Sequence, residues 1–240
     1  MVNNKDEIKD KFKIGDEIDK PKFDTLIDDL DSLIPKDNFK VISGHGFPGG
    51  KITAVPGTIY HDLDETMGAR LWIKSKGVDN QNWKPLHADT GTREIPVRNG
   101  KNSKVFIQRV GNVVSITFGG SQWGWFSLDL AKLKKEEWLM VEKGEDLWIK
   151  IGSAKATSFH NDFIPPGFRA TGGTTTGVYD DNSKLVGAMY YGGQSDSNAL
   201  ILRFPKTKKS TLTDKFLTEL RVAGMTYLTD NEWPIAFIDK

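Results

Sequence analysis

The chain has 240 residues, with 33 Lys and Arg against 32 Asp and Glu, so its formal net charge is +1. This balance lacks the basic excess of duplex-binding proteins, and the composition argues against a nucleic-acid partner. The absence of cysteine excludes a disulfide scaffold and a thiolate metal site, so the fold depends on burial of apolar side chains.

The composition favours β structure and a protein that is folded inside a cell. The chain contains 24 Gly, 7 Trp and 13 Phe and is rich in Thr and Val, as expected for short strands joined by tight turns. Residues 1–13 are charged and lack the apolar run of a signal peptide, and the sequence shows no stretch that predicts a membrane span. We therefore expect synthesis in a cytoplasm, no membrane insertion, and release only by lysis or within a particle.

Residues 5–34 contain the one convincing helical pattern. Apolar side chains recur there at spacings of three and four residues, at Phe23, Leu26, Ile27, Leu30, Leu33 and Ile34. Four of them also fit a and d positions over two heptads: Phe23, Leu26, Leu30 and Leu33. Two interpretations stay open, because such a stripe serves equally as a seam between copies and as an amphipathic helix packed on its own chain. We expect residues 1–38 to form a helical stem or attachment segment.

Residues 39–97 predict a small β module. The Gly-rich stretch 43–51 has the composition of a phosphate loop, but His45 and Ile52 stand where that loop needs Gly and Ser or Thr, so we interpret it as a connector. Residues 56–95 then alternate short strand-like runs with Gly and Asx turns, with Trp at strand positions.

Residues 98–240 predict a larger β domain. The runs 105–110 and 113–118 flank Gly111-Asn112, which is a strong hairpin signal. Further strands are expected at 185–191, 199–204, 222–228 and 235–238, whereas 171–177 is expected to be a loop. The segment 129–141 fits one helix face, and a loop with short strands fits nearly as well. The predicted fold class is mainly β, with a short N-terminal helical stem, a small β module and a β-sandwich or jelly-roll-like head.

Aromatic side chains beside polar groups are the best candidates for binding a ligand, because sugar rings stack on aromatic faces while their hydroxyls need hydrogen-bonding partners. Trp123 and Trp125 are separated by one glycine and would share a face in a strand; packing of both in the core is the alternative. Tyr190 and Tyr191 are consecutive, so one should face the core and the other the surface. The other candidates flank the Pro-Pro-Gly turn at 165–167: His160, Asp162 and Arg169. An ordinary solvated turn is the alternative there.

The sequence contains no convincing catalytic or metal-binding pattern. The four histidines, His45, His61, His87 and His160, lack ligand spacing, and no Gly-x-Ser-x-Gly elbow occurs. Glycoside hydrolysis needs two carboxylates, which Asp64, Glu65, Asp162, Asp180 or Asp181 would have to supply, and spacing along the chain cannot test this. We expect a binding protein without a cofactor, with a polysaccharide depolymerase as a less favoured alternative.

Several segments resemble tail-fibre and baseplate proteins of phages that infect Gram-positive bacteria. Arg109-Val-Gly-Asn-Val-Val114 is similar to their Arg-Val-Gly-Asn-Thr-Val hairpin, Ile164-Pro-Pro-Gly-Phe-Arg169 to their Pro-x-Gly-Phe-Arg turn, and Thr226-Tyr-Leu-Thr-Asp-Asn-Glu-Trp-Pro234 to their C-terminal strand and turn. Residues 12–30, Asn82-Trp83 and Asp89-Thr-Gly-Thr-Arg93 add to the series, which keeps the family's order. One departure is Thr92, where the family often has Trp after Asp-Thr-Gly.

The resemblance implies a homotrimeric virion protein of the tail tip, baseplate or tail fibre. Its N-terminal segment would attach to other tail or baseplate proteins, and the seam at Phe23, Leu26, Leu30 and Leu33 would lie between copies. The β-rich head would bind host cell-wall polysaccharide or teichoic acid. A purely structural assembly subunit of the tail is the alternative from another class.

Overall fold

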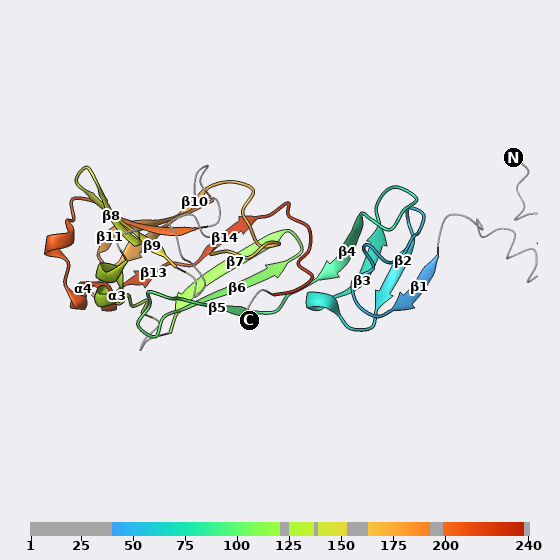
Figure 1. Cartoon of the computed structure of the whole chain (residues 1–240), viewed down its shortest axis with the longest axis horizontal. Helices are drawn as coiled ribbons and strands as arrows, with labels where there is room; N and C mark the ends of the chain where they lie inside the picture. The colour runs from blue at the N-terminus through green and yellow to red at the C-terminus, as the bar shows by residue number, and fades with distance from the viewer. Residues whose placement is uncertain (1–39, 121–124, 137–138, 153–162, 193–198, 238–240) are drawn as a thin grey trace, which may run out of the picture. The chain divides into compact units, whose positions relative to one another are not determined.

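The computed structural model describes residues 40–120, 125–136, 139–152, 163–192 and 199–237, and within them the protein is mainly β (Figure 1). The predicted helical stem, including its apolar stripe, lies outside the described residues. The chain divides into two compact units: a small unit with described residues 40–63 and 71–84, and a large unit that comprises 64–70 and the chain from 85 onward. The sequence predicts a small β module that ends at residue 97, but the small unit ends earlier. The reason is that β5 (Arg93–Pro96) pairs with β6 (Lys104–Val110) of the large unit.

The small unit is built on a sheet with the order β1 (Val41–Gly44), β2 (Ile59–Asp62), β3 (Ala69–Lys74) and β4 (Trp83–Ala88). β1 and β2 are parallel, and β2 and β3 are antiparallel. Tyr60, Trp72 and Trp83 are buried on one face, where Phe47 packs edge-on against Trp72. Large aromatic rings thus give this small unit a core of its own.

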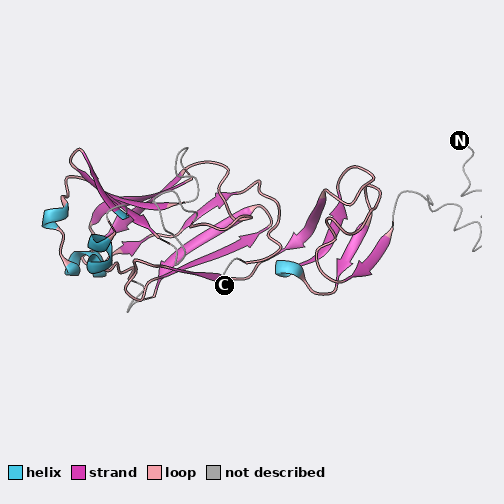
Figure 2. Ribbon diagram, in the orientation of Figure 1, coloured by secondary structure: helices cyan, strands magenta, loops and turns pink. Residues whose placement is uncertain are grey.

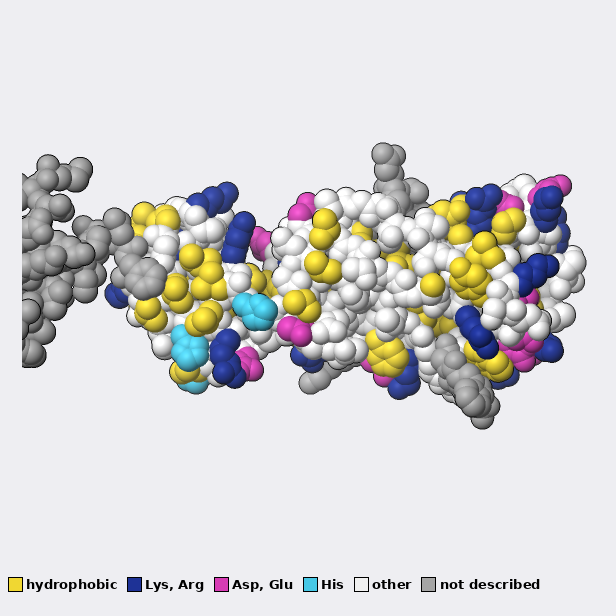
Figure 3. Space-filling view, turned by 180° about the vertical axis from the view of Figure 1, so that it is seen from behind, with side chains coloured by type: hydrophobic (Ala, Val, Ile, Leu, Met, Phe, Trp, Pro, Cys, Tyr) yellow, Lys and Arg dark blue, Asp and Glu magenta, His cyan; other side chains and the backbone are white. Residues whose placement is uncertain are grey.

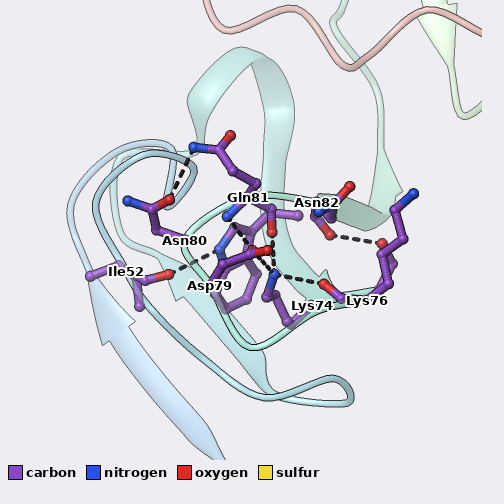
Figure 4. Close-up of polar contacts among 9 residues, drawn as sticks. Ile52, Lys74, Lys76, Asp79, Asn80, Gln81 and Asn82 are labelled. Carbon is purple, nitrogen blue, oxygen red and sulfur yellow. Dashed lines mark hydrogen bonds and ion pairs between the residues drawn. The ribbon is translucent and has the colours of Figure 1, made fainter.

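Lys74 holds the loop 75–82 in place, as Figure 4 shows. Its side chain is 0% exposed, and Nζ donates to the carbonyl oxygens of Lys76 (2.7 Å) and Gln81 (2.5 Å) and to Oδ1 of Asp79 (2.5 Å). An ammonium group has three donors, so this buried charge is fully satisfied. The hydrogen bond from Lys74, followed by that from the Gln81 N–H, lowers the pKa of Asp79.

The large unit contains two sheets (Figures 1 and 2). The four-stranded sheet has the order β14 (Met225–Leu228), β7 (Val113–Gly119), β6 and β5. The six-stranded sheet has the order β13 (Arg221–Val222), β10 (Thr174–Tyr179), β11 (Leu185–Tyr191), β12 (Leu200–Phe204), β9 (Asp146–Ile151) and β8 (Met140–Lys143). The strands that are neighbours in these sheets pair antiparallel.

Side chains along each strand face alternately inward and outward, and the inward-facing apolar ones of both sheets form one core. Val105, Ile107 and Ile116 of the four-stranded sheet belong to the same buried cluster as Ile149 and Leu202 of the six-stranded sheet. Short helices lie outside the strands: η1 (Thr66–Gly68), α3 (Leu130–Lys135), η4 (Lys209–Thr211) and α4 (Asp214–Thr218). None of the described helices is long and apolar enough to cross a membrane.

The hairpin prediction is confirmed, and two local predictions change. β6 and β7 pair from Lys104–Gly119 to Val110–Val113 across Gly111-Asn112. The segment 129–141 contains α3, whose N-cap Asp129 accepts from the N–H groups of Ala131 and Lys132, and its last residues belong to β8. The run 222–228 is divided between β13 and β14, which belong to different sheets.

Two sequence predictions of structure are wrong. The sequence predicts a loop at 171–177, but β10 begins at Thr174, where three β-branched threonines pair with β11. A strand was expected at 235–238, but residues 235–237 form no strand, since they follow Pro234, which lacks the N–H that a ladder requires. Phe237 instead packs edge-on against Phe168.

Candidate functional site

The residues that the sequence predicts to bind a ligand differ in their surroundings in the structure. Trp123, His160 and Asp162 lie outside the described residues, as do the predicted oligomerisation residues Phe23, Leu26, Leu30 and Leu33. Tyr191 is 2% exposed and packs against Tyr227 in the core, so its ring is closed to a ligand. Tyr190, Arg169 and Trp125 are part-buried. The structure therefore keeps Tyr190 as a surface candidate and removes Tyr191.

Tyr190 belongs to an aromatic and charged group on the outward face of the six-stranded sheet. Period-two alternation sends Leu147 and Ile149 of β9 into the core and turns Trp148 outward. Arg203 of β12 stands directly opposite Trp148, and Tyr190 of β11 stacks on Trp148 with ring centroids 5.9 Å apart and an interplanar angle of 26°. We call Lys143, Asp146, Trp148, Tyr190 and Arg203 the Trp148 cluster.

Charges surround the indole of Trp148. The Arg203 guanidinium carbon lies 5.5 Å and Lys143 Nζ 5.0 Å from the ring centroid, within the range of cation–π attraction. Arg203 also donates from Nε to Asp146 Oδ2 at 2.7 Å, while its Nη1 lies 3.5 Å from the Tyr190 hydroxyl oxygen. The hydrogen bond with Tyr190, followed by that with Asp146, raises the pKa of Arg203. The guanidinium therefore stays charged over the whole physiological range.

This arrangement has the chemistry of a saccharide-binding surface. A stacked aromatic pair offers apolar ring faces, and the adjacent Arg and Asp offer a donor and an acceptor for hydroxyl groups. The side chains of Arg203 and Asp146 are 37% and 20% exposed, so both reach solvent. Lys143 is exposed and can move off the indole, because a lysine side chain is long and flexible. Two cations against one carboxylate favour a ligand that carries negative charge.

Sequence reasoning found only Tyr190 of this cluster. The missed signal is the alternation in Asp146-Leu-Trp-Ile-Lys-Ile151, where apolar side chains occupy every second position and Trp148 stands with Asp146 on the other face. Strand pairing then brings Arg203 and Tyr190 to Trp148 from positions 55 and 42 residues later in the chain. No spacing rule along the sequence predicts that pairing.

A second group, the Arg109 junction, unites the segments on which the family resemblance depends. Arg109 is 3% exposed at the end of β6. Its guanidinium donates to four backbone carbonyl oxygens: those of Gly111 (2.7 Å), Gly167, Asn231 (3.0 Å) and Glu232 (3.0 Å). The ring of Trp233 lies 4.9 Å from its central carbon. Burial lowers the pKa of Arg109.

Further bonds connect the same segments. Asn231 Oδ1 accepts from the N–H groups of Gly167 and Arg169, both at 3.3 Å, and the Tyr227 hydroxyl donates to the Phe168 carbonyl oxygen at 2.7 Å. Thr90, from the Asp-Thr-Gly motif, accepts from the Arg109 N–H at 2.9 Å. Four motif segments that lie far apart in sequence therefore meet at one buried junction. Their side chains serve the fold, and Arg169 belongs with them through its N–H and through Nε, which donates to the Ile164 carbonyl oxygen at 3.4 Å.

A hollow of about 370 Å³ lies beside the junction. Its lining is mostly apolar and comprises Pro166, Gly167, Asn231, Glu232, Trp233, Pro234, Ile235 and Ala236. Ligand pockets are commonly of this volume, but part of the polar lining here, such as the Asn231 side-chain oxygen, is engaged in the junction. Trp125 precedes the fully buried Phe126, and the expected shared face with Trp123 falls outside the described residues.

Comparison with protein-family models, with curated proteins and with solved structures finds no match to this chain. The described residues contain no group of three or more His, Cys, Asp or Glu that could hold a metal ion.

Proposed function

We propose that the protein is a virion adhesin of a phage that infects Gram-positive bacteria, and that its large unit binds host cell-wall polysaccharide or teichoic acid at the Trp148 cluster. The large unit would act as a sandwich-like receptor-binding head. The observation that carries this proposal is the stacked Trp148–Tyr190 pair with Arg203 and Asp146 on a solvent-reaching sheet face. No bond is made or broken in this mechanism, and it needs no cofactor.

The convergence of the motif segments at the Arg109 junction supports the family part of the proposal. Motifs that resemble one family in the same order would preserve a shared fold if they formed one structural unit, and here they do meet. The same proposal places the protein at the tail tip or baseplate, as a homotrimer with a seam at Phe23, Leu26, Leu30 and Leu33. The N-terminal segment would attach it to other tail proteins.

Multiple copies would give the binding strength. A single stack and a few hydrogen bonds bind a sugar weakly, and several heads on one particle convert weak contacts into high avidity. Teichoic acid combines hydroxyl groups with phosphate charges. It therefore matches both the aromatic pair and the excess of cations in the Trp148 cluster.

A binding assay with purified Gram-positive cell walls tests the proposal. Full-length protein should be retained by the walls, and Trp148→Ala and Tyr190→Ala should each lower the affinity about tenfold, the expected loss of one stacking contact. Leu185→Ala, an exposed position of the same strand as Tyr190, is the matched control and should bind normally. Thermal unfolding must show that each variant is folded. Equal wall binding by all variants would reject the Trp148 cluster as the site.

A purely structural tail subunit is the second candidate, because the Arg109 junction shows that the motif residues build the fold rather than a binding surface. It predicts no binding to cell walls together with tight binding to a baseplate protein. A depolymerase is less favoured. Asp180, one of its candidate carboxylates, accepts the N–H groups of Asn182 and Lys184 in a turn. Release of reducing sugar ends, abolished by a single Asp or Glu substitution, would favour the enzyme.

A further inference from the structure

The small unit has an apolar sheet face opposite its aromatic core. Strand pairing aligns two rows across this face: Val41, Ile59 and Ile73 form one, and Ser43, His61 and Leu71 form the other. Leu63 follows His61 at the next position of the same alternation. Val41 is 61%, Leu63 52% and Leu71 40% exposed, and Ile59 and Ile73 are part-buried. We call Val41, Ile59, Leu63, Leu71 and Ile73 the small-unit face.

The exposure of this face needs an explanation. Single exposed apolar side chains are ordinary, but adjacent ones on one sheet face mark a surface that another element covers. Figure 3 shows hydrophobic side chains gathered on the side of the small unit that it presents to the viewer. β1 is also the last strand of its sheet, so one of its edges is unpaired within the described residues. An unpaired edge beside an apolar face is a site for association with another chain.

We propose that the small-unit face is an interface between copies of this chain. Neither row contains Asp, Glu, Lys or Arg, and Lys84 of β4 adds a charge only at the margin of the sheet. In a threefold assembly, the residues of a patch that lie nearest the axis meet their own copies. A charge at such a position would repel its own copies, whereas an uncharged apolar patch can pack there. A charged foreign partner would find nothing to pair with in either row.

The position of the small-unit face in the chain also supports contact with another copy of the protein. Val41 follows the apolar stripe that ends at Ile34 after only six intervening residues. A seam formed by that stripe would bring the small units of neighbouring copies together, because six residues span at most about 20 Å. The small-unit face would continue the seam. This inference draws on the proposed homotrimer for its symmetry and is independent of glycan binding.

Light scattering on full-length variants is the first test. The wild type should have the mass of an oligomer, and Leu71→Asp should convert it to monomer, because a carboxylate cannot be buried unpaired against its own copy. Leu185→Asp places the same charge at a similarly exposed leucine of the large unit and should leave the mass unchanged. A monomeric wild type, or an unchanged mass for Leu71→Asp, would overturn the proposal.

Cross-linking covers the case in which Leu71→Asp does not fold. Because the chain has no cysteine, Leu71→Cys introduces the only thiol, and a short bismaleimide can then join only two different copies. The expected product is a covalent dimer, absent for Leu185→Cys at the same protein concentration. Monomer alone would contradict the proposal. The double variant Leu30→Cys with Leu71→Cys tests whether residues 23–34 of the same chain cover the small-unit face instead. A disulfide within one chain would show that they do, and would overturn the proposal.

The same preparations separate this inference from the adhesin proposal. If Leu71→Asp is monomeric and each copy still binds a soluble teichoic acid fragment, both proposals stand and only avidity is lost. Oligomers that bind no cell-wall component would reject the adhesin and leave the interface intact.

Discussion

Two arginines of the large unit, Arg109 and Arg203, have similar aromatic neighbours but differ in burial and in hydrogen-bond partners. Each guanidinium lies near the ring of a tryptophan, Trp233 for Arg109 and Trp148 for Arg203. Arg109 is 3% exposed and donates to backbone carbonyl oxygens, whereas the side chain of Arg203 is 37% exposed and pairs with a carboxylate. Burial lowers the pKa of Arg109, while the partners of Arg203 raise its pKa.

The difference separates a group that builds the fold from a group that reaches solvent. The motif residues that carry the family resemblance are gathered at the Arg109 junction, where their polar groups satisfy one another. The Trp148 cluster contains only one residue that the sequence singled out, and it is the group that reaches solvent. Residues of the first kind maintain a fold, whereas a ligand can reach only groups that are open to solvent.

The largest effect is expected for Arg109→Leu. It removes the donor from four backbone carbonyl oxygens, of which that of Gly167 is buried, and it empties the site of a buried guanidinium, so we expect a loss of about 3–5 kcal/mol in the free energy of unfolding. Urea denaturation of the large unit measures it. Arg203→Leu is the matched control and should lose far less, since its partners remain hydrated. Equal losses of unfolding free energy in the two variants would show that Arg109 is no more important to stability than Arg203.

Gly167→Ala should be the next most damaging change. Gly167 has φ +87°, and a Cβ there would lie 2.8 Å from Cβ of Pro234. Backbone strain and the clash together should cost about 1–3 kcal/mol. Gly111→Ala is the control, because its φ is +56° but a Cβ would have open space, so only strain of about 1 kcal/mol is expected. Equal melting temperatures for the two variants would show that the Pro-Gly turn is not constrained by Pro234.

Alkaline pH should weaken the junction through Tyr227. Burial, followed by the nearby Tyr191, raises the pKa of Tyr227 above its ordinary value of 10.0. Stability from a group whose pKa is raised in the folded state is fully present below the unfolded pKa and is lost as pH rises above it. The expected loss is about 1.4 kcal/mol per pH unit above pH 10. Tyr227→Phe should be less stable at pH 8 through the lost bond to Phe168, yet should lose stability less steeply above pH 10. Parallel pH profiles would contradict this.

The smallest effect is expected for Lys143→Ala in the Trp148 cluster. Lys143 is exposed and lies over the indole, so its removal should leave stability unchanged. It should weaken binding to teichoic acid about two- to fivefold by removing one attractive charge, and should not change binding to a neutral polysaccharide. Equilibrium binding at low and moderate salt measures both. An equal loss for both ligands would mean that Lys143 acts through packing and not through charge.

Local pattern predicted the parts of the fold that depend on neighbours in sequence. Alternation and Gly111-Asn112 were sufficient for the β6–β7 hairpin, and aromatic and glycine content for the mainly β class. β10 was missed although its threonines pair with β11, the next strand along the chain, and the division of 222–228 between two sheets depends on tertiary packing. Trp148 could have been found from its strand alone. Its meeting with Tyr190 and Arg203 could not, because strand order sets that contact.

The indole N–H resonance of Trp148 tests the central claim most directly. The chain contains 7 Trp, so a nitrogen-15 spectrum should resolve up to seven indole signals, and Trp148→Phe identifies the one concerned. On titration with purified teichoic acid or cell-wall polysaccharide, the Trp148 signal should shift in a saturable way while the signals of Trp72 and Trp233, buried in the two units, stay in place. Saturable shifts of other indole signals with Trp148 unmoved, or no shift with any cell-wall component, would contradict the account.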